Sequence, residues 1–167
     1  MILTEIDHVA IAVNDLEAAI DYYRRAFGAE VDHREVVERD GVEEALLKVA
    51  ESYVQLLTPT RPDSPVAKAI EKRGEGLHHV GYRVADCAAA LKAMVAAGAT
   101  PIDKEPRPGS RGTTVAFIHP KGSYGTLIEL VQEECRTASE DAAHEALQVG
   151  ALRERQQGRV IGGLREA

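Results

Sequence analysis

One stretch of the 167-residue chain occurs twice, and this repeat limits the possible folds more than any other feature of the sequence. Residues His8–Asp15, HVAIAVND, return 71 residues later as His79–Asp86, HVGYRVAD. Each aspartate precedes an Ala-rich amphipathic stretch that ends close to a glycine, Gly28 or Gly98. Aspartate at the start and glycine just past the end are typical helix boundaries. The chain is therefore predicted to contain two related halves, each with a strand followed by a helix.

Three further strands are predicted in each half. The dipeptide Asp40-Gly41 is a strong hairpin signal, and it separates two runs with strand composition. The two halves end in similar apolar strands that carry one polar residue each, Gln55 and Glu129. The predicted helices span 16–26 and 87–97, and the additional strands span 31–38, 43–49, 53–57, 100–103, 113–119 and 127–131, with a loop at 106–112.

Two βαβββ modules in tandem predict an α+β fold in which a curved eight-stranded sheet surrounds a shared cavity. The modules cover about residues 4–60 and 76–133, within a domain of residues 1–133. Ser64, Pro65 and Gly74 frame a short connecting helix as N-cap, first helical residue and stop. Residues 134–167 lie outside the repeat, and we expect a helical or disordered extension there.

Composition excludes several classes of function. The chain has 20 Lys and Arg against 27 Asp and Glu, a net charge of −7, and no basic cluster, so neither nucleic acid nor an anionic membrane is an expected partner. No apolar run approaches the roughly 20 residues that span a bilayer. The two cysteines, Cys87 and Cys135, do not form a disulfide framework, and the N-terminus lacks the pattern of a signal peptide. A cytoplasmic protein is the expectation.

Strand alternation selects four polar side chains. Side chains along a strand point alternately to opposite faces, so His8 shares a face with Ala10, and His79 shares the equivalent face with Gly81. The neighbour His78 matches Asp7 and is predicted to point the other way. Gln55 and Glu129 hold matching positions in the closing strands.

Two imidazoles, one amide oxygen and one carboxylate in matched positions predict a divalent metal site on a pseudo-two-fold axis. A lone polar group within an apolar run would cost about 1–3 kcal/mol if it remained unpaired. These donors suit Co²⁺, Mn²⁺, Ni²⁺, Zn²⁺ or Fe²⁺.

The two halves resemble the vicinal-oxygen-chelate superfamily and, within it, the methylmalonyl-CoA epimerases. The resemblance covers residues 6 to about 133. It is carried by Ile6–Ala12, Gly41–Ala45, Tyr53–Leu57, Gly76–Val80 and His119–Lys121 followed by Gly125–Leu130. It implies His8, Gln55, His79 and Glu129 as metal ligands, with Co²⁺ expected first.

The same resemblance implies a catalytic pair, Glu44 and Glu129. The family's Gly-Val-x-Glu string places its glutamate at Glu44, although Glu43 lies beside it and alternation does not choose between the two. The implied reaction moves a proton at C2 of methylmalonyl-CoA through a metal-stabilised enolate, with Glu44 and Glu129 approaching C2 from opposite sides. Glu129 would be both ligand and proton carrier.

The implied partners are an acyl-CoA substrate and a second copy of the chain in a homodimer. Arg107, Arg111 and Lys121 lie in loops where they could meet CoA phosphates. Ethylmalonyl-CoA stays open as a substrate, as does a glyoxalase I-type lyase acting on a glutathione hemithioacetal. An extradiol dioxygenase would leave Gln55 without a role, and a binding protein of this fold would not need four ligands.

Overall fold

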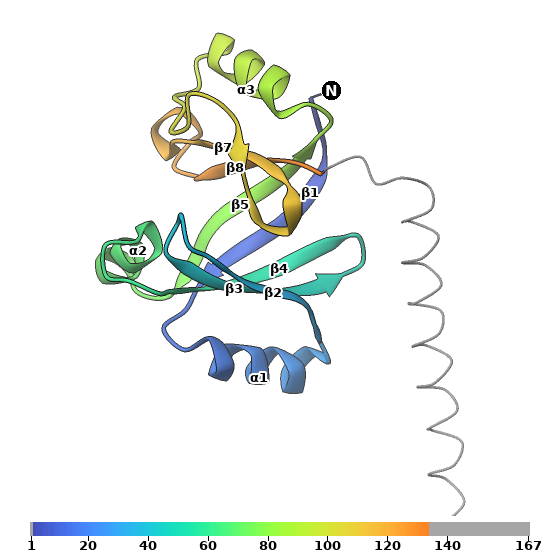
Figure 1. Cartoon of the computed structure of the whole chain (residues 1–167), viewed down its shortest axis with the longest axis vertical. Helices are drawn as coiled ribbons and strands as arrows, with labels where there is room; N and C mark the ends of the chain where they lie inside the picture. The colour runs from blue at the N-terminus through green and yellow to red at the C-terminus, as the bar shows by residue number, and fades with distance from the viewer. Residues whose placement is uncertain (1, 134–167) are drawn as a thin grey trace, which may run out of the picture. The chain divides into compact units, whose positions relative to one another are not determined.

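The computed structural model describes residues 2–133, which form one mixed eight-stranded sheet with the order β2-β3-β4-β1-β5-β8-β7-β6 (Figure 1). The predicted α+β fold is confirmed. The strands are β1 (Leu3–Ala12), β2 (Val31–Val37), β3 (Val42–Val49), β4 (Ser52–Pro59), β5 (Gly76–Val84), β6 (Arg107–Pro108), β7 (Thr114–Ile118) and β8 (Ile128–Gln132).

Both predicted module helices form where the repeat places them. The Asp15 carboxylate accepts a hydrogen bond from the Ala18 backbone N–H at the start of α1 (Leu16–Phe27), and Gly28 ends this helix in the left-handed conformation. Asp86 caps α3 (Cys87–Ala96) in the same way, at Ala89.

The connecting helix α2 (Pro65–Arg73) follows its predicted N-cap, Ser64, whose hydroxyl accepts from the Ala67 backbone N–H.

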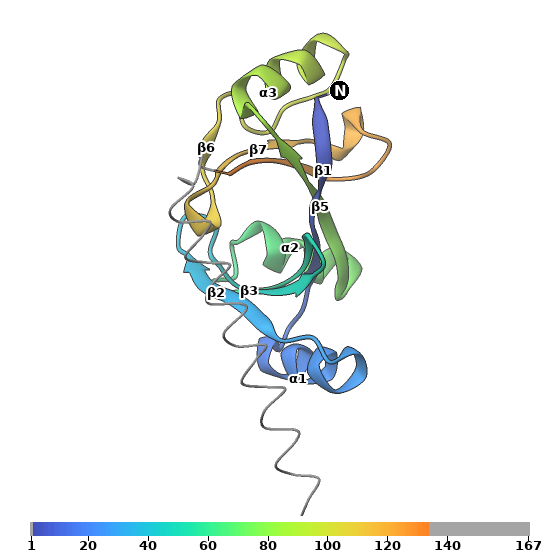
Figure 2. The ribbon, with the colours of Figure 1, turned by 90° about the vertical axis from the view of Figure 1, so that its right-hand side faces the viewer.

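The two modules meet along antiparallel β1 and β5, and the sheet curls so that its outer strands turn toward each other (Figure 2). Helices α1 and α3 pack on the outer face, α1 against β3 and β4 and α3 against β7 and β8. Val66 of α2 packs inside with a smaller group of buried apolar side chains that includes Ala10 and Leu57. The inner face of the sheet is therefore only partly filled.

One strand differs from the prediction. The sixth strand, β6, lies within the segment predicted as a loop, and residues 100–103 contribute only an isolated bridge between Pro101 and Ile118. Proline has no N–H to donate, and the Asp103 carboxylate accepts the Phe117 backbone N–H in place of a strand carbonyl. A ladder therefore cannot continue along this stretch.

Matched irregularities interrupt the central strand pair. Ile6 pairs with Tyr82 while His8 pairs with Gly81, which leaves Asp7 as an extra residue in β1. Likewise Ala10 pairs with His79 while Ile11 pairs with Leu77, so that His78 is the extra residue in β5. Such bulges redirect side chains that alternation would send elsewhere.

The predicted helical or disordered extension, residues 134–167, lies outside the described residues. Within residues 2–133, no helix has both the length and the apolar character needed to cross a membrane.

Candidate metal centre

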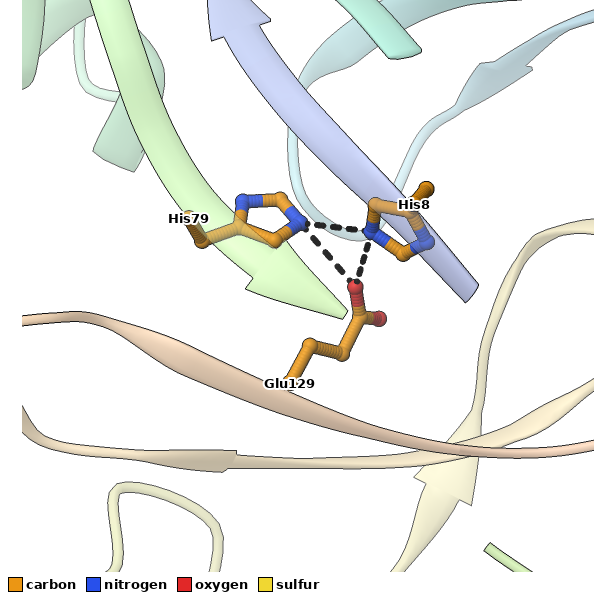
Figure 3. A group of neighbouring side chains, drawn as sticks. All are labelled: His8, His79 and Glu129. Atoms are coloured by element: carbon orange, nitrogen blue, oxygen red, sulfur yellow. Dashed lines mark hydrogen bonds and ion pairs between the residues drawn. The ribbon is translucent and has the colours of Figure 1, made fainter. Parts of the chain in front are cut away.

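Three of the four predicted ligands converge on one point beside the β1–β5 seam (Figure 3). Nε2 of His8 and Nε2 of His79 lie 3.0 Å apart, and each lies 3.0 Å from Oε2 of Glu129. Donors about 2.1 Å from an octahedral ion are themselves about 3.0 Å apart at neighbouring positions. The spacing of the triad matches that requirement.

Small residues on the facing strands make space for the two rings. His8 pairs with Gly81, and a Cβ atom built on Gly81 would lie 2.6 Å from Nδ1 of the His8 ring. Ala10 occupies the corresponding position opposite His79 and is fully buried. Gly81 therefore makes space for the His8 ring.

Each ring uses its second nitrogen in a hydrogen bond. The Asp7 carboxylate accepts from Nδ1 of His8 at 2.8 Å, and Nδ1 of His79 lies 2.8 Å from Nδ1 of His78. When both Nδ1 atoms carry the proton, both Nε2 atoms present lone pairs toward the Glu129 carboxylate. Lone pairs that face each other at 3.0 Å require a cation between them, so the triad fits a divalent metal ion.

The electrostatics of the site also favour positive charge. Burial alone would lower the pKa of His8, but hydrogen bonds with the Asp7 and Glu129 carboxylates and their charges raise it to about 9. Burial opposes ionisation of Glu129, yet hydrogen bonds from His79 and His8 hold its pKa far below the usual range. The centre is thus a buried anionic position that binds either a proton or a cation.

The fourth predicted ligand, Gln55 on β4, lies in the same cavity but has a second contact. Its Nε2 donates to Oε2 of Glu44 at 2.7 Å. Its buried Oε1 has no hydrogen-bond partner among the described residues. An amide oxygen left in this state is available to a metal ion, and the amide nitrogen then fixes the neighbouring carboxylate.

The structure separates the two adjacent glutamates on β3. Glu44 is buried and lines the cavity, whereas Glu43 is half-buried and forms an ion pair with Arg34. Burial raises the pKa of Glu44, and the charges of Glu129 and Glu35 add to the rise against an opposing contribution from Ser110. Of the two glutamates, Glu44 is therefore the one that faces the cavity.

The cavity has a volume of about 330 Å³. Gln55, His79 and Glu129 form its polar floor with Glu44, and apolar side chains such as Leu57 and Phe117 form much of the wall. A few polar groups within an apolar cleft are typical of small-molecule sites.

Sequence reasoning missed two residues of this centre. The prediction that His78 faces away from His79 is wrong. The bulge in β5 brings the His78 ring next to the His79 ring and into the cavity wall. Strand alternation gives Asp7 no role in the site, yet its carboxylate accepts a hydrogen bond from His8 Nδ1. No feature of the sequence around Asp7 indicates that its side chain lies behind His8, because the bulge that places it there is seen only in the strand register.

The basic loop residues divide into different environments. Nη2 of Arg111 donates to the Asp7 carboxylate at 2.7 Å. Arg107 lines the cavity, where it pairs with Asp40 and Asp103 and lies over the Phe117 ring. Lys121 is exposed.

Comparison with known proteins finds a family and close relatives. The sequence pattern of one protein family, the Glyoxalase/Bleomycin resistance protein/Dioxygenase superfamily, matches residues 7–117. The ethylmalonyl-CoA/methylmalonyl-CoA epimerase of Cereibacter sphaeroides is 40% identical over 129 residues, which are 76% of this chain and 96% of that protein. The mitochondrial methylmalonyl-CoA epimerase of Homo sapiens is 34% identical over 131 residues, 78% of this chain and 74% of that protein.

A solved structure of a methylmalonyl-CoA epimerase is also similar to this chain, in sequence and in fold. A variant of the Streptomyces coelicolor methylmalonyl-CoA epimerase, in complex with 2-nitronate-propionyl-CoA, is 44% identical to this chain. The two superpose with a TM-score of 0.77 over 80% of this chain and 99% of that one. The shared fold therefore extends over nearly the whole described region.

Proposed function

Because this chain belongs to the glyoxalase/bleomycin resistance protein/dioxygenase superfamily, we propose that it is a metal-dependent epimerase that interconverts (R)- and (S)-methylmalonyl-CoA. The homologues with named activities in these comparisons are methylmalonyl-CoA epimerases, one of which is also named for ethylmalonyl-CoA. Such enzymes are isomerases. The observation that carries the proposal is the convergence of His8, His79 and Glu129 at 3.0 Å beside the buried Glu44, whose Oε1 has no hydrogen-bond partner among the described residues.

The ligands in this proposal are His8, Gln55, His79 and Glu129. A divalent ion bound there supplies a Lewis acid that offsets negative charge on the substrate's oxygens. The two imidazoles, the amide and the carboxylate come from four different strands of the two modules, so the folded sheet sets their spacing. We expect Co²⁺ first, with Mn²⁺, Ni²⁺, Zn²⁺ and Fe²⁺ also compatible with this donor set.

The proton is moved by Glu44 and Glu129 in this proposal. Epimerisation at C2 requires that a proton leave one face of the carbon and another arrive on the opposite face. Glu44 on β3 and Glu129 on β8 both line the cavity and come from different modules, which supports their action from two sides of one substrate. The raised pKa of Glu44 suits a general base, because its conjugate acid is then closer in strength to the carbon acid.

The remaining features of the proposal concern the setting of the enzyme. We predict a homodimer and a cytoplasmic location. For the acyl branch at C2 we propose a methyl group first, with an ethyl group as the alternative.

The decisive experiment measures deuterium incorporation at C2 of methylmalonyl-CoA in D₂O. The full chain is compared after Co²⁺ loading and after chelator treatment, and loss of stereochemistry is followed in parallel. Fast, metal-dependent exchange with racemisation is the expected result. Exchange at the rate of the chelator-treated control would refute the epimerase.

A glyoxalase I-type lyase is the second candidate, because the same donor set and the same proton chemistry serve it. Conversion of a glutathione hemithioacetal to the thioester, without exchange at C2 of methylmalonyl-CoA, would establish that function instead.

A further inference from the structure

Two of the three bulges in the β1–β5 pair each place one residue behind a ligand histidine. Asp7 and His78 are the extra residues of β1 and β5, and each directly precedes the histidine whose Nδ1 it contacts. A regular strand would direct these side chains to the opposite face. The bulges therefore create a partner for both rings.

The two partners differ in chemistry. His8 has a carboxylate at 2.8 Å, whereas His79 has another imidazole at the same distance. A carboxylate accepts a hydrogen bond from an imidazole N–H more strongly than a neutral ring nitrogen does. This stronger hydrogen bond increases the electron density at the other nitrogen of the imidazole. The two histidines therefore hold equivalent positions in the repeat, but their hydrogen-bond partners differ in chemistry.

Asp7 is held on all sides by charged donors. Its side chain is completely buried, Oδ2 accepts from Nε and Nη2 of Arg83 at 3.1 and 2.9 Å, and Oδ1 accepts from Nη2 of Arg111 at 2.7 Å. Arg83 comes from β5, and Arg111 comes from the turn Ser110–Gly112. Arg111 has a φ of 56°, a left-handed conformation that is unfavourable for a non-glycine residue and that its contacts must offset.

We propose that Asp7 is the positioning residue of the metal centre. It fixes the proton of His8 on Nδ1 and the ring plane toward the cavity, so that Nε2 is a preformed and electron-rich donor, while Arg83 and Arg111 keep the carboxylate in place. The inference rests on the proposed function, since it takes His8 as a metal ligand. It adds that the strength of metal binding is set by a residue that touches neither metal nor substrate.

The test is Co²⁺ affinity, measured on the full chain by visible absorbance in competition with a chelator. Asp7→Asn keeps the shape of the side chain and removes its charge, and we expect Co²⁺ to bind 10–100-fold more weakly, as for other residues behind metal ligands. The matched control is Glu5→Gln, because Glu5 also pairs with Arg83, at 2.7 Å, but contacts neither histidine. The control is expected to bind Co²⁺ within about twofold of the parent chain.

A second measurement does not depend on whether the variant folds. In the unmodified chain loaded with Zn²⁺, side-chain ¹H–¹⁵N spectra of histidine are expected to show the His8 proton on Nδ1 and none on Nε2. A His8 proton on Nε2 overturns the inference. So does Co²⁺ affinity in the Asp7→Asn variant equal to that of the parent.

Failure of the proposed function is a separate result. If the unmodified chain binds neither Co²⁺ nor Zn²⁺, the metal-dependent epimerase is refuted, and the inference falls with it. If the unmodified chain binds Co²⁺ and exchanges C2 protons while Asp7→Asn does both equally well, only the inference is refuted.

Discussion

The His8 ring occupies the space that a side chain at Gly81 would fill. The two residues face each other on β1 and β5, and a Cβ atom on Gly81 would lie 2.6 Å from Nδ1 of the ring. Glycine is therefore required here for close approach and not for backbone freedom, since Gly81 does not adopt a positive φ. The position of one ligand is set by the absence of a side chain on the neighbouring strand.

Gly81→Ala is expected to displace His8 and abolish metal binding. The added methyl group and the His8 ring cannot occupy the same space. The strands that carry them, β1 and β5, lie at the centre of the sheet and do not shift readily. Overpacking of this kind costs about 1–3 kcal/mol of stability, so the variant should still fold. Metal content after reloading, measured beside the circular dichroism spectrum, checks the prediction. A folded variant with full metal content would contradict it.

Glu44→Gln is expected to reduce epimerisation by about 10²–10⁴-fold while the bound metal is retained. Glutamine has nearly the same shape and cannot accept a proton from carbon. Glu43→Gln is the matched control on the same strand, because Glu43 pairs with Arg34 outside the cavity, and it should keep nearly full activity. Equal loss in both variants would exclude Glu44 as a specific base.

Gln55→Leu is expected to act on both metal affinity and turnover. The variant loses the amide oxygen that would bind the metal and the N–H that donates to Glu44 at 2.7 Å. Loss of a hydrogen bond to a charged group, about 1.5–3 kcal/mol, corresponds to a fall in kcat of about 10–100-fold, even at saturating metal. Titration of activity with Co²⁺ separates the two effects. A kcat that recovers completely at high Co²⁺ would show that Gln55 does not position Glu44.

Removal of the metal is expected to lower thermal stability. An ion present at about 100 times its Kd contributes about 2.7 kcal/mol, which corresponds to a Tm higher by about 5–10 °C for a chain of this size. Melting curves with Co²⁺, with chelator and with Ca²⁺ test this expectation. Ca²⁺ is the control, because it prefers more oxygen ligands than this centre offers. An equal shift with both ions would indicate non-specific binding.

The sequence predicts the fold and the cluster of donors because both follow from the repeat. Two copies of one pattern define two modules, and strand alternation then directs His8 and His79 to one side. The choice between Glu43 and Glu44 does not follow in this way. β3 is buried on both faces, by α1 outside and by the cavity side chains inside, so its apolar residues show no period that could distinguish the faces.

The two bulges beside the ligand histidines are a second feature that could not be predicted from the sequence. One extra residue reverses the alternation locally, and nothing in the composition around Asp7 or His78 marks it. The short strand β6 could not be predicted from the sequence either, because Arg107–Pro108 forms only a two-residue strand within a segment that is rich in proline and glycine.

The placement of donors on both sides of the β1–β5 seam makes the centre a cross-link. His8 and Gln55 come from the first module and His79 and Glu129 from the second, so each module alone carries half of the donors. Without an ion, the strands that flank the β1–β5 pair can open independently in the two modules in local unfolding events. A bound ion joins segments up to 121 residues apart, much as a disulfide would, and opening of either module must then break metal bonds. Hydrogen exchange in β4 and β8 should therefore slow together on loading, and the two halves should become a single cooperative unit.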